Sequence, residues 1–196
     1  MFANSCSRSF WVTVACSLLS VFPVRAQTPR QIFDQAVIDF RAGRIEEAVA
    51  GFDQVARAQP VSAPQLWQRG IALYYAGRYE ECRRQFEQHR TVNPNDVENA
   101  AWHFACVAKA ESPAAALSAI LPVGPDRRRP MREIYEMFSG RLTPEGVFAA
   151  SGRQPLARFY AHLYRGLYHD ALGRAEAARE EIFLAADDRF SGVGGY

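Results

Sequence analysis

Hydrophobic positions recur along most of the chain every three or four residues, the spacing that places apolar side chains on one face of an α-helix. Short segments that contain glycine or proline interrupt this pattern at intervals, as turns between helices do. No stretch shows the strict alternation that is typical of a half-buried β-strand. From residue 29 to residue 189 we therefore predict an all-α fold of about five helix pairs.

The helical pattern repeats itself after 34 residues. Residues 42–47 (AGRIEE) return at 76–81 as AGRYEE, with a single difference. A period of this length is typical of a helix-turn-helix repeat, in which small residues let two helices approach, glycine forms the turn and proline ends the second helix. The same shift pairs Ala36 with Gly70, Phe40 with Tyr74, Ala48 with Cys82, Phe52 with Phe86, and Pro60 with Pro94.

A third copy lies 96 residues beyond the second. Arg69-Gly70 corresponds to Arg165-Gly166, and Gly77-Arg78 corresponds to Gly173-Arg174. The offset is six residues short of three periods, so the intervening segment holds two repeats that have lost six residues between them. We predict a first repeat at 29–62, a second at 63–96, two degenerate helix pairs at 97–158, a last repeat at 159–190 and a tail at 191–196.

These repeats resemble the tetratricopeptide repeat (TPR) family, which implies a right-handed α-solenoid with a concave binding face. Over roughly residues 63–190 the chain is similar to the NlpI-like TPR lipoproteins of the bacterial cell envelope, notably at RGIALYY (69–75), NPND (93–96) and Phe159-Tyr160. The resemblance implies an envelope adaptor that docks proteases and cell-wall hydrolases. The chain differs from that family in lacking a good lipobox.

The first residues have the pattern of an export signal. Residues 10–24 carry no charge, follow Arg8, and are fewer than the 20 or so residues that span a bilayer as a helix. The VRA sequence at 24–26 has the small residues that a signal peptidase requires on either side of a larger one. We therefore predict cleavage after Ala26 and a periplasmic or secreted protein without a transmembrane span. The alternatives are a lipoprotein processed at Cys16 and an organelle transit peptide.

Cleavage after Ala26 would change the net charge and the cysteine content of the protein. The chain has 23 Lys and Arg against 21 Asp and Glu, and removal of residues 1–26 deletes two arginines and no acid. The mature chain is then neutral, which argues against a nucleic-acid partner bound by bulk positive charge. Cleavage also leaves Cys82 and Cys106, on neighbouring repeats, as a candidate disulfide in an oxidising compartment. The alternative is two small buried residues without a bond.

Motifs for catalysis or cofactor binding are absent from the sequence. It contains no HExxH, CxxC, GxGxxG, P-loop or GxSxG. His103 and Cys106 share one predicted helix face, but two ligands are too few for a closed zinc site. The glutamate pairs at 80–81 and 180–181 point about 100° apart on a helix, so we expect them to face solvent. We expect no enzymatic activity, no metal and no cofactor.

Two aromatic stripes on predicted first helices are the candidates for partner binding. The members of each stripe are spaced so that they share one helix face. The first stripe consists of Trp67, Ile71, Tyr74 and Tyr75, and the second of Tyr160, Tyr164 and Tyr168. TPR arrays line their concave face with first-helix side chains, and tyrosine offers a peptide both apolar area and a hydroxyl group. The alternative is that both stripes fill the core between stacked helices.

A basic run is a second candidate for partner binding. Arg127, Arg128 and Arg129 follow one another in a predicted loop and could bind an acidic partner, although loop arginines are usually only solvated.

The end of the last predicted helix carries an apolar face. Ile182, Phe183 and Leu184 lie in a helix predicted from 175 to about 188, and they span more than one of its faces. A solenoid needs a polar cap at its end, and the glycine-rich tail is too short to provide one. We expect a second chain, a partner or a further C-terminal segment to cover this face.

Together these features predict an exported TPR adaptor or scaffold that binds protein or peptide partners through its concave face. The alternatives are a self-assembling structural protein, with a homodimer through the C-terminal face, and an organellar assembly factor.

Overall fold

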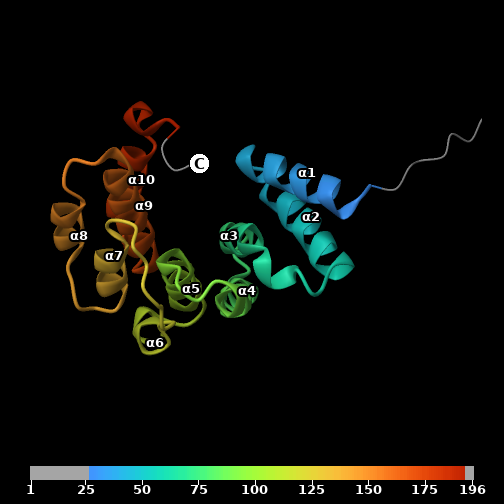
Figure 1. The fold of residues 1–196 in the computed structure, drawn as a ribbon, viewed down its shortest axis with the longest axis horizontal. Helices are drawn as coiled ribbons and strands as arrows, with labels where there is room; N and C mark the ends of the chain where they lie inside the picture. Colours follow the sequence, from blue (N-terminus) through green and yellow to red (C-terminus); the bar gives the residue numbers. More distant parts are fainter. Residues whose placement is uncertain (1–26, 193–196) are drawn as a thin grey trace, which may run out of the picture.

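The computed structural model describes residues 27–192, which form ten α-helices and two short 3₁₀-helices without a β-strand (Figure 1). The prediction of an all-α fold is therefore confirmed. The predicted signal peptide at 1–26 and the last four residues of the predicted tail lie outside the described residues. Within residues 27–192, no helix combines the length and the apolar character that a membrane span requires.

The helices follow one another as five consecutive pairs whose members contact each other. A 3₁₀-helix, η1 (Ala63–Gln65), precedes the second pair, and another, η2 (Asp188–Phe190), follows the last. The pairs are α1 (Pro29–Arg41) with α2 (Ile45–Ala58), α3 (Trp67–Tyr75) with α4 (Tyr79–Val92), α5 (Val97–Ala110) with α6 (Pro113–Ser118), α7 (Met131–Phe138) with α8 (Pro144–Ser151), and α9 (Pro155–Ala171) with α10 (Ala175–Ala185).

The repeated glycines form the same turn in the first, second and last pairs. Gly43, Gly77 and Gly173 have φ angles of 74°, 72° and 72°, the left-handed conformation that glycine adopts without strain. In each turn the N–H of the following arginine donates to the carbonyl five residues earlier, at 2.9 Å. This hydrogen bond satisfies an orphan carbonyl at the helix end, so one short sequence specifies three helix hairpins.

Small residues allow the two helices of a pair to approach closely. A Cβ atom added at Gly70 would lie 2.7 Å from the ring of Phe86, and one added at Gly166 would lie 2.7 Å from Ile182. In the first pair, a Cβ added at Gly51 would lie 2.8 Å from that of Ala36. Any larger side chain would separate the helices, since protein interiors are packed without spare volume.

The five pairs do not form a simple row. α5 contacts α7 and also α9, so the last pair packs directly beside the third (Figure 1). α6 has only six residues, and the prolines of the 119–130 segment prevent it from continuing. Because so short a helix covers little of α5, the flank of α5 remains available to α9. α7 and α8, which have eight residues each, pack against α9 instead of forming a full layer between the pairs.

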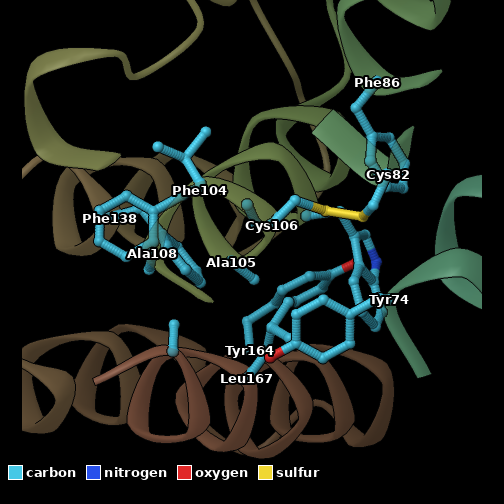
Figure 2. Packing of buried hydrophobic residues seen from close by; sticks show 14 of the residues in the cluster. Tyr74, Cys82, Phe86, Phe104, Ala105, Cys106, Ala108, Phe138, Tyr164 and Leu167 are labelled. Carbon is cyan, nitrogen blue, oxygen red and sulfur yellow. A yellow bond between two sulfur atoms is a disulfide. The ribbon is translucent and has the colours of Figure 1, made fainter. Parts of the chain in front are cut away.

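A continuous core joins these helices and contains a disulfide. Cys82 of α4 and Cys106 of α5 are both fully buried, and their Cα atoms lie 5.8 Å apart. Figure 2 shows the bond between their sulfur atoms, with Tyr164 and Leu167 of α9 beside Ala105. The disulfide therefore connects the second pair to the third at the centre of the molecule.

The C-terminal end differs from the prediction. The last helix ends at Ala185, and the chain turns back so that Phe190 of η2 is buried against Phe159 and His162 of α9. Ile182 is 40% exposed and contacts Gly166, whereas Phe183 is 80% exposed. The end of the stack is thus partly covered by the chain itself, because a helix stop after Ala185 lets the following segment fold back.

Candidate partner-binding groove

A groove runs between the first helices of the second, third and last pairs. It consists of two adjoining cavities of about 230 and 420 Å³, and both are lined by Trp102 of α5 and Leu163 of α9. The smaller cavity is also lined by Trp67, Ile71, Phe86, His89, Asn93, Asp96, Glu98, Asn99 and Tyr164. The larger is also lined by Tyr74, Tyr75, Tyr79, Lys109, Gly166, Leu167, Asp170, Ala175, Ala178, Arg179 and Ile182.

Trp102 forms a rigid base between the two cavities. Its ring lies 5.5 Å from that of Tyr74 in an edge-to-face contact and 6.4 Å from that of Phe86 in a stacked one. Only 8% of its surface is exposed, and these rings from α3 and α4 fix its position. The sequence places Trp102 on a first helix, but periodicity alone does not show that it would lie where two cavities meet.

The stripe on α3 is divided between groove and core. Trp67 and Tyr75 are 37% and 59% exposed and line one cavity each, and half-buried Ile71 lies between them. Tyr74 is buried, and its hydroxyl donates a hydrogen bond to Asp170 of α9. The groove leaves only part of this stripe open to solvent. Tyr74 therefore belongs to the packed interface between α3 and α9.

The stripe on α9 faces mainly the core, as the alternative interpretation of the stripes expects, although Tyr164 also lines the smaller cavity. Tyr160 and Tyr164 are buried, and the hydroxyl of Tyr164 donates to Glu98 of α5. Tyr168 packs against Phe104 and Phe138, with ring centroids 6.0 and 5.3 Å away. Because α9 packs directly on α5, this face of the helix is covered. Its neighbouring face lines the larger cavity, through Leu163, Gly166, Leu167 and Asp170.

Asp170 connects the walls of the groove to its base. One of its oxygens accepts the Tyr74 hydroxyl hydrogen, and the other lies 2.9 Å from Nζ of Lys109 on α5. Burial and this hydrogen bond raise the pKa of Tyr74 well above its usual range, so the phenol remains a donor at neutral pH. Arg179, exposed at the edge of the larger cavity, forms no ion pair among residues 27–192.

Arg128 is not the free cation that the basic run predicts. Its guanidinium binds Asp96 at 2.7 Å and Asp126 at 2.6 Å, and it also binds Glu98. Its guanidinium carbon lies 5.9 Å from the centre of the Tyr160 ring. The acidic partners of Arg128 are therefore within the chain, where they hold the 119–130 loop on α5. Arg127 and Arg129 are exposed.

Asn99 is a groove residue that sequence reasoning missed. It is 4% exposed on α5 and lines the smaller cavity with Trp67 and Trp102. Its Oδ1 atom accepts no hydrogen bond from the described residues. A buried acceptor of this kind costs free energy unless a donor reaches it, so a bound segment that presents an N–H group would gain from this position. A lone asparagine in the apolar 97–108 segment is the signal that could have identified it.

The remaining polar candidates are structural. The sulfur of Cys106 lies in the disulfide, so it cannot ligate a metal with His103. Among residues 27–192 no group of three or more His, Cys, Asp or Glu side chains is arranged to hold a metal ion. Glu181 is buried rather than solvent-facing, because its two oxygens lie 2.8 Å from Nδ1 of His162 and 2.9 Å from Arg165.

No protein-family model matches the sequence, and no curated protein matches it. A functional assignment therefore rests on the groove itself, which offers exposed aromatic side chains, a buried acceptor and a charged rim.

Proposed function

We propose that this protein is an exported TPR adaptor that binds a segment of a partner protein in the groove between α3, α5 and α9. The observation that carries the proposal is that Trp67 and Tyr75 remain exposed on either side of the buried Trp102. Large aromatic side chains that line a cavity and are not covered by the chain itself are the usual anchors of a protein interface.

Three features support the TPR assignment. The 34-residue repetition coincides with three turns of the same geometry, and close helix approach recurs at equivalent positions such as Gly70 and Gly166. The groove is lined mainly by first helices, as the concave face of a TPR array is. By the resemblance to the NlpI-like proteins, we propose envelope proteases or cell-wall hydrolases as the partners.

Two features support export to the periplasm or the exterior. The first 26 residues have the pattern of a cleavable signal peptide. The disulfide between Cys82 and Cys106 belongs to an oxidising compartment, because cytosolic reductants keep most thiols reduced.

The groove favours a segment with two apolar side chains and a polar backbone or side chain between them. One apolar group would contact Trp67 in the smaller cavity, and the other would contact Tyr75 in the larger one. Between them, Asn99 would accept a hydrogen bond from the segment. An extended strand or one face of a helix could meet these requirements.

The test is affinity capture from an envelope extract with the purified protein as bait. Trp67→Ala and Tyr75→Ala each remove an exposed groove aromatic, and Phe183→Ala is the matched control because Phe183 is 80% exposed outside the groove. We expect each groove variant to lose at least about tenfold in capture of the same partner, as truncation of an interface anchor does. Loss of capture in Phe183→Ala alone would contradict the groove and favour assembly through the C-terminal face.

A further inference from the structure

A further cavity of about 410 Å³ lies at the N-terminal end of α9, and none of its residues lines the groove. Three arginines line it, together with the apolar faces of a proline and a phenylalanine. The lining residues are Arg153, Arg158, Arg189, Pro155 and Phe190. Three arginine side chains that line one cavity give it a positive potential, which favours an anionic ligand.

Two of the three guanidinium groups are held in place by the chain. Nε of Arg158 donates to the carbonyl of Gly152 at 2.7 Å, and its guanidinium carbon lies 4.9 Å from the centre of the Phe148 ring. An Nη atom of Arg189 lies 2.8 Å from Asp187. These contacts leave other N–H groups of both side chains available. A binding site gains affinity when its donors are fixed before the ligand arrives.

Arg153 provides the third group and is not held. It is exposed, and within residues 27–192 it forms no ion pair and no side-chain hydrogen bond. It is therefore free to close over an anion once the other two arginines have bound it.

The charge of the site suits a dianion. Arg189 is paired with Asp187, whereas Arg153 and Arg158 have no carboxylate partner among the described residues, so two of the three lining arginines keep an unpaired charge. The first turn of α9 adds to this potential, because the helix is 17 residues long and its N-cap residue, Gln154, makes no side-chain cap. The peptide N–H groups of Leu156 and Ala157 are thus uncapped at the same helix end.

We propose that this cavity binds a phosphate group. A single bidentate arginine satisfies the two oxygens of a carboxylate, whereas a phosphate monoester presents three oxygens and about two negative charges to three guanidinium forks. The cavity is larger than a phosphate ion, and Phe190 and Pro155 give it apolar sides for the organic part of an ester. The phosphate could belong to a soluble monoester or to phosphatidic acid, since the headgroup of that lipid is also a phosphate monoester.

The experiment titrates the purified protein with phenyl phosphate and with benzoate by calorimetry. It also measures cosedimentation with vesicles that contain phosphatidic acid and with vesicles of phosphatidylcholine alone at low salt. We expect phenyl phosphate to bind at least about tenfold more tightly than benzoate, because the phosphate accepts more charge-assisted hydrogen bonds than the carboxylate does. Binding of phenyl phosphate alone assigns the site to soluble esters, and retention on phosphatidic acid that phenyl phosphate displaces assigns it to lipid. Either result supports the proposal.

The variants are Arg153→Gln and Arg189→Gln, and the control is Arg132→Gln on α7, whose side chain is 80% exposed outside this cavity. Arg153 forms no ion pair or side-chain hydrogen bond that stabilises the fold. Its variant should therefore keep the helicity of the native protein and lose at least about tenfold in phosphate affinity. Equal affinity in Arg153→Gln, Arg189→Gln and the control would overturn the proposal, as would the absence of binding to both phosphate sources. Trp67→Ala should bind phosphate normally, which separates this site from the groove.

Discussion

The hydroxyl of Tyr74 donates a hydrogen bond to the carboxylate of Asp170, which lies 96 residues further along the chain. That separation is the offset between the second repeat and the last, so the two residues occupy the same position in different repeats. Lys109 of the third pair binds the other oxygen of Asp170 at 2.9 Å. One carboxylate therefore connects the first helices of all three pairs that form the groove.

Tyr74→Phe tests how much the hydrogen bond between Tyr74 and Asp170 stabilises the fold. The change removes one hydrogen bond to a charged group and keeps the aromatic packing, so we expect a loss of about 1.5 to 3 kcal/mol in the free energy of unfolding. Urea denaturation followed by circular dichroism measures it. Tyr75→Phe is the matched control, because the Tyr75 hydroxyl makes no hydrogen bond among the described residues. Equal stability of the two variants would show that the bond contributes nothing.

The same tyrosine predicts a dependence of stability on alkaline pH. Burial and the bond to Asp170 raise the pKa of Tyr74 in the folded protein above the ordinary value near 10. Above that pH the unfolded chain releases the phenolic proton and the folded chain keeps it, so the free energy of unfolding falls as pH rises. Tyr74→Phe should show a shallower decline between pH 9 and 11, in denaturation curves collected in steps across about that range. Parallel curves for the two proteins would contradict the assignment.

The disulfide between Cys82 and Cys106 predicts a difference between oxidised and reduced protein. Its cysteines are 24 residues apart in sequence, and the entropy of closing a loop of this size corresponds to about 3 kcal/mol of stability. We expect urea denaturation in the presence of a reductant to show a loss of that order. The double variant with both cysteines changed to alanine should not respond to the reductant, and a response in it would place the effect elsewhere.

Gly70→Ala tests the close approach of α3 and α4. The added Cβ would lie 2.7 Å from the Phe86 ring, and overpacking of this kind costs about 1 to 3 kcal/mol. If the clash is specific, adding Phe86→Leu to the glycine variant should cost less than Phe86→Leu costs alone. Thermal denaturation of the two single variants and the double variant measures this coupling. Additive losses would mean that the ring is not what excludes the methyl group.

The sequence predicts the parts of this fold that depend on short segments. The repeated Ala-Gly-Arg turn and the small residue at Gly70 both follow from local spacing, and the structure shows the turn and the close approach of two helices at Gly70. Spacing also predicts that Tyr160, Tyr164 and Tyr168 share a face. It does not predict which neighbour covers that face, because this depends on the direct packing of α9 on α5.

Contacts between distant segments account for what the sequence does not predict. Arg128 belongs to a basic run, yet its partners are acids that lie near it only after the loop folds onto α5. Leu163 and Asp170 had no distinguishing pattern, and they became groove residues through the position of α9. One local feature does contribute to the packing of α9 on α5. α6 is short because of the prolines that follow it, and it leaves the flank of α5 open.

The central claim is that a partner segment lies against Trp67 and Tyr75. Site-specific photocrosslinking tests it most directly, with benzoylphenylalanine placed at position 67 and, as a control, at Val61, which is 93% exposed and lines neither groove cavity. In an envelope extract we predict one dominant crosslinked protein from position 67, abolished by Tyr75→Ala and absent from position 61. Equal crosslinking from both positions, or crosslinking at 67 that Tyr75→Ala leaves unchanged, would contradict the account.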